Sequence, residues 1–486
     1  MTTPTKAVFR VTEHGLLSRD DTERVLDRIQ EKLTGRGTSR IVLSSTWSGD
    51  LRWARNRASM TSDRRDIKIL VFREIRGGRG VATTNQIDDV SLDGVVASAE
   101  RLALKEADQR PGDVSLEPPI LTSPQTTTWS DRTLDRTVEE SAQLVQQVTS
   151  DAEARQLMSA GYIESHGMTV GTRSIDVYDR IERTYGAMTQ AQCTVTVRHP
   201  KGTGSGWAGL ARYDLAKVDE AAIAARAMEK CLASLDPVRI EPGRYTVILE
   251  PQAVADLVQL MLDGQTLPMD RVTAEDPRHR NPYYLESDRS IGRDRSKLGY
   301  KIVDERITIS HDPSDPDLGT LAVPGLGPIT WIENGILTGM SYGRGYAINE
   351  LNEHEPVHRR LSYRMTGGTT SIDEMIAGTK RGLLVTRFSK LRVIDASSLF
   401  ATGVTRDGLW LVENGRISKS VRNFRIGESP LFALNNVEAL GIPTPVYQPF
   451  EWPELGPFWE TFALSQVIVP ALKVNDFSFT STIDAL

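Results

Sequence analysis

Hydrophobic residues near the start of the chain first recur every three or four positions and then alternate. The first pattern, over residues 20–33, predicts an amphipathic helix that Ser18 or Asp20 caps. A second helical stripe follows Ser91, which we expect to cap that helix. Between the two helices, alternation predicts strands, and glycines predict the turns. The expected strands cover 41–43, 51–60, 66–74 and 81–85. Helices and strands in this order indicate an α+β layered arrangement.

A region rich in prolines separates this segment from further helices and strands. Four prolines and a run of threonines over 110–130 predict a connecting loop. Helices expected over 132–159 and 221–232 enclose a strand-rich stretch between 162 and 197. Proline and glycine then punctuate the chain around residue 237. We therefore expect an N-terminal α+β domain over 1–236 and a second domain over 237–486.

The second half of the chain is richer in strand patterns. A strand over 245–249 leads into a helix over 252–261. Two hairpins are expected, because Asn334-Gly335 and Asn414-Gly415 stand between apolar residues and suit turn positions with positive φ. The apolar stretch from Val467 to Phe479 predicts strands held in a sheet. The pattern indicates a mostly antiparallel β domain with a few helices.

Composition narrows the class of protein. The chain has 486 residues and a net charge of −6 with interspersed signs, which argues against a nucleic-acid-binding surface. Its two cysteines, Cys193 and Cys231, cannot form a disulfide scaffold, so a reducing compartment is expected. The N-terminus lacks the apolar core of a signal peptide, and no apolar run is long enough to span a membrane. These features predict a cytoplasmic protein with no membrane partner.

Six stretches of the sequence resemble the TldD/PmbA family of peptidase proteins in their order and spacing. They are Leu51–Asn56, Ile75–Asp88, Glu241–Leu249, Trp331–Tyr346, Gly382–Thr386 and Gly408–Gly415. The resemblance covers most of the chain and implies the family's two-domain α+β fold.

The family's active members carry a HExxxH motif on the helix after the strand that enters the second domain. Two histidines there bind zinc, a glutamate activates the bound water, and a cysteine near the C-terminus is thought to complete the site. In this chain the corresponding helix, Ala253–Asp263, contains neither histidine nor glutamate, and no cysteine follows Cys231. The resemblance is therefore to the PmbA (TldE) type of subunit.

That resemblance implies a partner and a substrate. The TldE-like subunit pairs with a TldD-like metallopeptidase subunit that holds the zinc, while this chain binds no cofactor itself. The pair is expected to cleave unfolded or short peptides, also during peptide maturation. An extended peptide would add to a sheet edge.

One segment matches a zinc motif literally. His354, Glu355 and His358 have the HExxH spacing of a zinc peptidase helix. Pro356 lies inside the motif and would disrupt a helix interior, so a loop without metal is the favoured interpretation. Two alternatives stay open: an autonomous metallopeptidase with a relocated site in this loop, and a peptide-binding module without turnover.

Other residues with chemical potential have simpler explanations. Tyr342 and Arg344, in a glycine-flanked loop after a hairpin, are candidates for contact with the substrate or the partner. Both cysteines have the sequence setting of small buried residues. Three further features are expected to be a surface loop, a hairpin tip and a packing aromatic. They are Arg278-His279-Arg280 with His311-Asp312, Gly202–Gly206, and Trp207.

Overall fold

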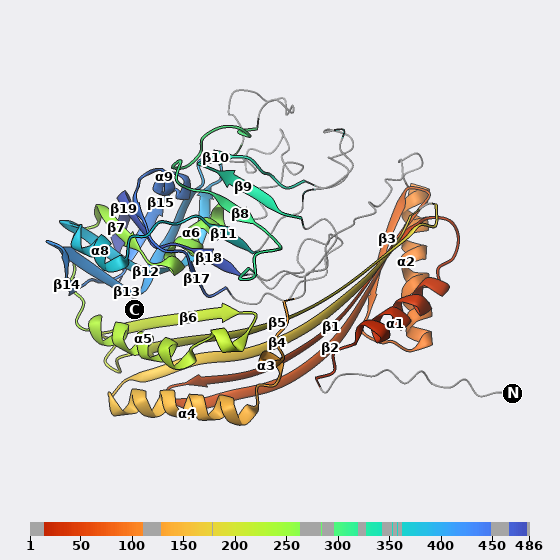
Figure 1. The fold of residues 1–486 in the computed structure, drawn as a ribbon, viewed down its shortest axis with the longest axis horizontal. Coiled ribbons are helices and arrows are strands. Elements are labelled where there is room, and N and C mark those ends of the chain that lie inside the picture. Colours follow the sequence, from red (N-terminus) through yellow and green to blue (C-terminus); the bar gives the residue numbers. More distant parts are fainter. Residues whose placement is uncertain are drawn as a thin grey trace.

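Strands before residue 237 and strands after it belong to different sheets in the computed structural model. The structure describes residues 14–109, 128–176, 178–262, 283, 296–318, 327–342, 352, 357, 362–448 and 466–483. In Figure 1 a long curved sheet lies below, and the strands of the second half lie above one end of it. The α+β class is confirmed. The domain limits 1–236 and 237–486 stay a prediction.

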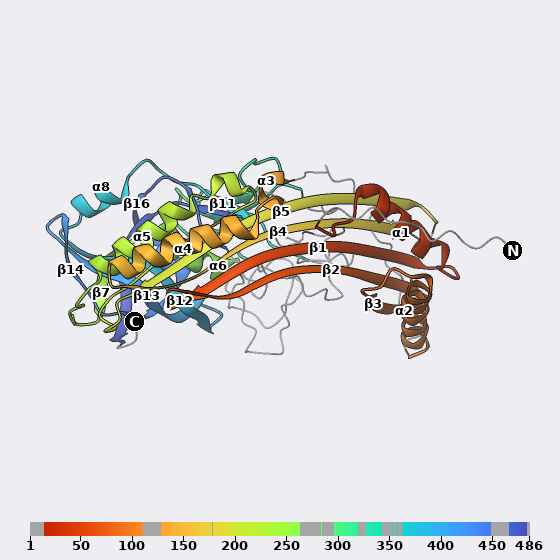
Figure 2. The same cartoon turned by 90° about the horizontal axis from the view of Figure 1, so that it is seen from below.

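The first sheet has six antiparallel strands in the order β3-β2-β1-β4-β5-β6. Four of them are unusually long, with 17 to 19 residues each, and lie along the long axis of the molecule (Figure 2). The strands are β1 (Thr38–Ala54), β2 (Arg57–Ile75), β3 (Gly78–Thr84), β4 (Met158–Ile175), β5 (Ile181–Arg198) and β6 (Ser205–Arg212). Pairing across this length places side chains from segments more than 100 residues apart on one face.

The strand expected over 51–60 is wrong, because the chain turns back inside it. Arg55 and Asn56 both have positive φ, at 51° and 59°, and join β1 to β2 as a two-residue hairpin. Such turns demand the left-handed conformation at both central positions, which asparagine tolerates. The turn lacks the glycine that usually reveals it in a sequence.

Helices cover one face of this sheet. Leu26 and Ile29 of the first helix pack with Ile41 and Val71 of the sheet, and Met228 of the last packs with Trp53 further along. The helices are α1 (Arg19–Glu31), α2 (Asp89–Gln109), α3 (Asp131–Leu134), α4 (Val138–Ala154) and α5 (Glu220–Ala233), with a 3₁₀ turn, η1 (Leu215–Lys217). Ser18 caps α1, as expected.

Two expectations about these helices are corrected. The single helix predicted over 132–159 is instead two, α3 and α4, because Thr137 forms a capping box with Glu140 and starts α4 afresh. The second helix is capped by Asp88 rather than Ser91: the Asp88 carboxylate accepts from the backbone N–H of Ser91 at 3.0 Å.

Close contact between α5 and β6 depends on a glycine. A Cβ at Gly206 would lie 2.2 Å from the carbonyl oxygen of Ala227 and 2.4 Å from the backbone nitrogen of Cys231. We expect Gly206→Ala to lower the free energy of unfolding by about 1–3 kcal/mol through overpacking, measured by urea denaturation. Gly94→Ala, at an exposed helical site with open space, is the control and is expected to be neutral or mildly stabilising. Equal effects of the two changes would refute this packing argument.

The strands of the second half form two sheets. In one, β12-β7-β19-β15-β13 closes on itself through pairing of β12 with β13, with β14 and β16 attached; the other has the order β10-β9-β8-β11-β18-β17. Among the paired strands that the structure describes in this half, β12–β7 and β11–β18 are parallel and the other pairs are antiparallel. The first sheet holds β7 (Gly243–Leu249), β12 (Arg381–Asp395), β13 (Phe400–Glu413), β14 (Arg416–Ser420), β15 (Phe424–Glu428), β16 (Val437–Leu440) and β19 (Leu472–Thr482).

The second sheet is built from short strands, and the described part of this half also contains helices α6, α8 and α9. The short strands are β8 (Ile309–His311), β9 (Ile329–Glu333), β10 (Ile336–Leu337), β11 (Tyr363–Met365), β17 (Thr444–Pro445) and β18 (Val467–Val469). The helices are α6 (Pro251–Met261), α8 (Ile372–Ala377) and α9 (Pro430–Asn435).

Several predictions for this half are confirmed. Both Asn-Gly turns occur, with φ of 48° and 79° at Asn334 and Gly335 and 50° and 78° at Asn414 and Gly415. The apolar C-terminal stretch forms two strands as expected: β18 lies between β11 and β17 in one sheet, and β19 lies between β7 and β15 in the other. In the described part of the chain, none of the helices has the length and apolar character needed to cross a membrane.

Candidate functional site

Helix α6 follows β7, where the family's metal motif would lie. Pro251 occupies its first turn, and the residues that it buries are all apolar, while Asp256 is half-buried. The helix carries no histidine, glutamate or cysteine. Across the described residues, no three histidine, cysteine or acidic side chains gather in a way that could hold a metal ion.

Two polar side chains in the first half of α6, Gln252 and Asp256, accept hydrogen bonds from neighbouring backbone. Asp256 accepts from the backbone N–H of Phe388 at 2.9 Å and from the side-chain amide of Gln252 at 3.1 Å. Gln252 in turn accepts from the backbone N–H of Tyr447 at 3.1 Å. Burial raises the pKa of Asp256 to about 6, although these hydrogen bonds act in the other direction. The carboxylate therefore works as a structural acceptor.

A buried ion pair joins the start of α6 to α5. Lys230 Nζ lies 2.5 Å from Glu250 Oε2, and both side chains are almost fully buried. Arg226 Nη2 lies 3.5 Å from the other carboxylate oxygen. The long sheet and the second half are thereby connected by charge as well as by apolar packing.

The face of the long sheet opposite the helices carries two transverse rows of polar side chains, which we call the two polar rows. Each row crosses four strands, β2, β1, β4 and β5, through directly paired residues. The first row holds Ser62, Asp50, Glu164 and Gln192, and the second holds Arg64, Ser48, His166 and Gln190. On β1, β4 and β5 all six are buried. Burying so many polar groups costs folding free energy unless each group has a hydrogen-bond partner.

The carboxylates of the rows are held by their neighbours. Glu164 Oε2 accepts from Gln192 Nε2 at 2.5 Å and lies 2.7 Å from His166 Nε2. Burial raises the pKa of Glu164, but these contacts more than offset it and hold the pKa below its usual value. Arg64, half exposed, lies 3.6 Å from Asp50 and 3.8 Å from Glu164. Glu164 is therefore held by hydrogen-bond donors from the neighbouring strand positions, and both carboxylates lie within 4 Å of one guanidinium.

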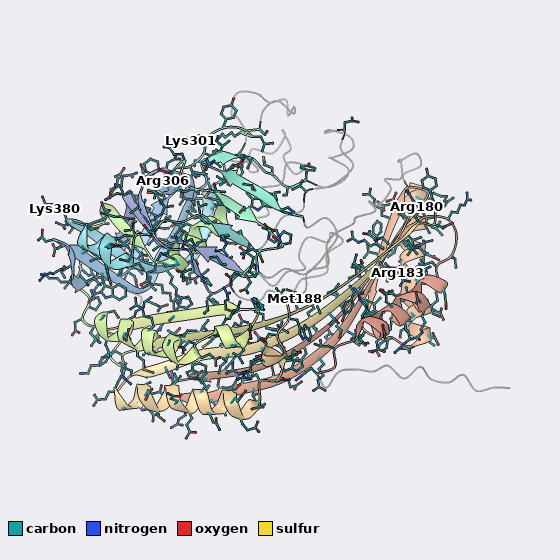
Figure 3. The ribbon with its side chains drawn as sticks, in the orientation of Figure 1. Arg180, Arg183, Met188, Lys301, Arg306 and Lys380 are labelled. Carbon is teal, nitrogen blue, oxygen red and sulfur yellow. The ribbon has the colours of Figure 1, made fainter. Side chains whose placement is uncertain are left out.

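Tyr447 connects α6 with this face. Its ring meets Trp207 of β6 edge-on at 6.0 Å between centroids, and Arg387 stacks on Trp207 at 4.5 Å. Burial raises the pKa of Tyr447 to about 12, and the charge of Glu164 contributes. The expectation that Trp207 serves packing is confirmed. Figure 3 labels Met188, two residues before Gln190 on β5, midway along the long sheet.

The HExxH match and the glycine-flanked loop before it fall largely outside the residues that the structure describes. Arg344, His354, Glu355 and His358 lie outside the described residues. Tyr342 is partly buried, packs against the main core of the second half, and pairs with Val357 through two backbone hydrogen bonds of 2.9 and 3.1 Å. Its role in contacting substrate or partner stays a prediction.

The structure shows where the other residues that the sequence singled out are buried or exposed. His311 was expected in a surface loop, which is wrong: it lies on β8, is buried, and its Nδ1 lies 2.9 Å from the carbonyl oxygen of Ser362. Asp312 after it is exposed, and 278–280 lie outside the described residues. Both cysteines are buried as expected, and burial raises the pKa of Cys231 to about 11. Of the hairpin tip predicted over Gly202–Gly206, residues 202–204 form the β5–β6 connection, whereas Ser205 and Gly206 already lie on β6.

Sequence reasoning missed Asp256, Tyr447 and the two polar rows. One signal was available: over Trp47–Trp53, polar residues alternate with Trp47, Leu51 and Trp53, which indicates a strand whose second face is polar. The partners on the other strands could not be found, because the register that unites them is non-local.

The fold is shared with proteins of known structure, and part of the sequence matches a family model. A family model described as the PmbA/TldA metallopeptidase C-terminal domain matches residues 242–481. Among solved structures, TldE from Thermococcus kodakarensis aligns with a TM-score of 0.69 and 17% identity, covering 94% of this chain and 99% of that one.

Two proteins described as candidate modulators of DNA gyrase also align with TM-scores of 0.69. The one from Thermotoga maritima has 16% identity and covers 94% of this chain and 100% of its own. The one from Bacteroides thetaiotaomicron has 14% identity and covers 96% and 99%. Identities this low establish the shared fold alone. No curated protein matches the chain.

Proposed function

The chain is a member of the TldD/PmbA family by its C-terminal domain, and from this we propose that it is the non-catalytic, TldE/PmbA-like subunit of a heteromeric zinc metallopeptidase. A TldD-like partner with a HExxxH motif supplies the zinc and the glutamate base. The substrates are unfolded or short peptides, including precursors in peptide maturation. The proposal places the complex in the cytoplasm, in keeping with two free, buried cysteines.

The chemistry of α6 carries this proposal. The six positions that open the helix, Pro251 to Asp256, offer one carboxylate and one carboxamide as their only polar side chains. Both already bond to backbone N–H groups of other strands and loops. A zinc site needs three protein ligands that converge on one point and leave one position open. The residues of α6 do not fit zinc, so no catalytic step is assigned to this helix.

What the chain contributes instead is a wall for the substrate. The long sheet presents the two polar rows on the face that also carries Trp207 and the contact with Tyr447. Within the described residues, the first part of β2, Arg57–Lys68, pairs with β1 alone, because β3 joins only from Ile69 onward. This stretch is an exposed strand edge, to which an extended chain adds through backbone hydrogen bonds.

Mixing two purified subunits tests the proposal. An unstructured peptide is incubated with this chain, with a HExxxH-bearing family member, and with both. We expect efficient cleavage only in the mixture, together with a heteromeric complex on size-exclusion chromatography. Zinc analysis of this chain alone should find far less than one equivalent. Cleavage by the isolated chain would overturn the proposal.

The same assay decides between the alternatives. Stoichiometric zinc that disappears in His354→Ala or His358→Ala would assign an autonomous site to that loop. Peptide binding without turnover in every mixture would leave a binding module. Unchanged behaviour of both variants is the result we expect.

A further inference from the structure

Within the proposed peptidase complex, we propose that the two polar rows bind the main chain of an extended peptide, with the carboxamide of Gln190 as the central contact. The inference rests on the proposed function for the identity of its ligand. It assigns that ligand to named residues on the sheet face.

Polar atoms in the rows lack the partners that buried groups normally have. Both polar atoms of the fully buried Gln190 side chain have no hydrogen-bond partner among the described residues. The same holds for the hydroxyl of Ser48, the Oε1 atom of Gln192 and the Oδ1 atom of Asp50. Buried groups of this kind are rare in folded proteins, and each requires an explanation. Here several of them face one side of one sheet.

The chemistry of these atoms matches an amide. The free carboxamide of Gln190 offers one acceptor and an N–H donor, which is the complement of a peptide group. Ser48 can donate or accept, and Gln192 keeps an acceptor after its nitrogen has bonded to Glu164. The carboxylates are already in contact with their neighbours: Asp50 and Glu164 lie 3.6 and 3.8 Å from Arg64, and Glu164 also accepts from Gln192 and lies against His166. The side chains of Gln190 and Ser48, which keep atoms without partners, are uncharged. A neutral main chain fits them better than a metal ion or an ammonium group.

The spacing of the rows matches an extended chain. The rows are two residues apart along each strand, which is about 7 Å. An extended peptide repeats its orientation at the same interval, so alternate peptide groups would meet successive rows. Met168 and Met188 lie beside the rows on one side. On the other side lies Tyr162, whose ring centroid is 4.5 Å from the guanidinium carbon of Arg52. Methionine and aromatic surfaces accommodate varied side chains, as a sequence-tolerant site requires.

Equilibrium binding to the full-length chain tests the inference. A fluorescent unstructured peptide is titrated in three forms: with free ends, with both ends blocked, and with alternate backbone nitrogens methylated. We expect the first two to bind equally and the methylated form to bind roughly tenfold more weakly, because N-methylation removes backbone donors. Gln190→Leu should also weaken binding of the first two forms about tenfold.

Two controls separate binding from folding. Gln146→Ala, on the exposed side of α4 and therefore beyond the other face of the sheet, should bind like the wild type. Gln190→Leu removes buried polar atoms that have no partner, so its melting temperature should equal or exceed that of the wild type. If Gln190 were instead hydrogen-bonded within the fold, its replacement would lower the melting temperature of the protein.

Three outcomes would overturn the inference. They are unchanged binding by Gln190→Leu, loss of binding when the peptide amine is blocked, and no peptide binding by the wild-type chain. The second would point to amine recognition at Asp50 and Glu164. None of these bears on the pairing with a metal-bearing subunit, which the mixing experiment decides on its own.

Discussion

Replacing Lys230 by methionine is expected to lower the free energy of unfolding by about 3–5 kcal/mol. Methionine fills a similar volume, but it leaves the Glu250 carboxylate buried without the ammonium that lies 2.5 Å away. Arg226 compensates little, because it lies 3.5 Å from the carboxylate and is half exposed. Since Glu250 directly precedes α6, the loss should loosen the junction between α5 and the second half.

Urea denaturation measures this effect, and a double variant isolates its cause. Lys230→Met combined with Glu250→Gln removes both charges, so we expect it to recover at least half of the lost stability. Lys105→Met, at an exposed position of α2, should change the free energy of unfolding by less than about 0.5 kcal/mol. If Lys230→Met costs no more than Lys105→Met, the pair contributes nothing to the junction.

Replacing Asp256 by asparagine should remove a pH dependence of about 3 kcal/mol from the stability of the chain. Burial raises the pKa of this carboxyl from 3.8 to about 6, a difference of about two pH units at 1.36 kcal/mol each. The folded state therefore favours the protonated form. The stabilisation is fully present below the unfolded pKa near 3.8 and is lost as the pH rises through 6.

Unfolding free energies of the wild type and Asp256→Asn, measured from pH 4 to pH 8, check this prediction. All other titrating groups cancel in the difference between the two proteins. We expect the wild type to lose about 2.5 kcal/mol relative to the variant over this range, because the unfolded carboxyl is already partly ionised at pH 4. A constant difference would show that the carboxyl is solvated, and the argument that α6 points its polar atoms into the fold would lose its support.

Local signals in the sequence were sufficient for elements with strong periodicity and for turns with defined chemistry. The helix that became α1 was predictable from its apolar spacing and its serine cap. The Asn-Gly turns were predictable because positive φ at two adjacent positions selects these residues. The turn at Arg55-Asn56 was not, because its first residue carries no such preference. The buried environment of His311 was hidden for a similar reason: burial belongs to the assembled core and not to three residues of strand.

By itself, the sequence determined that the helix after the entering strand carries no histidine, glutamate or cysteine, since the identity of eleven consecutive side chains does not depend on tertiary structure. It could not determine what those side chains do. Only the folded chain brings Phe388 and Tyr447 against α6, and only the register of four strands collects Ser48, Glu164 and Gln190 into the two polar rows. Strand pairing is a long-range choice, and a shift by one residue would have turned every one of these side chains to the opposite face.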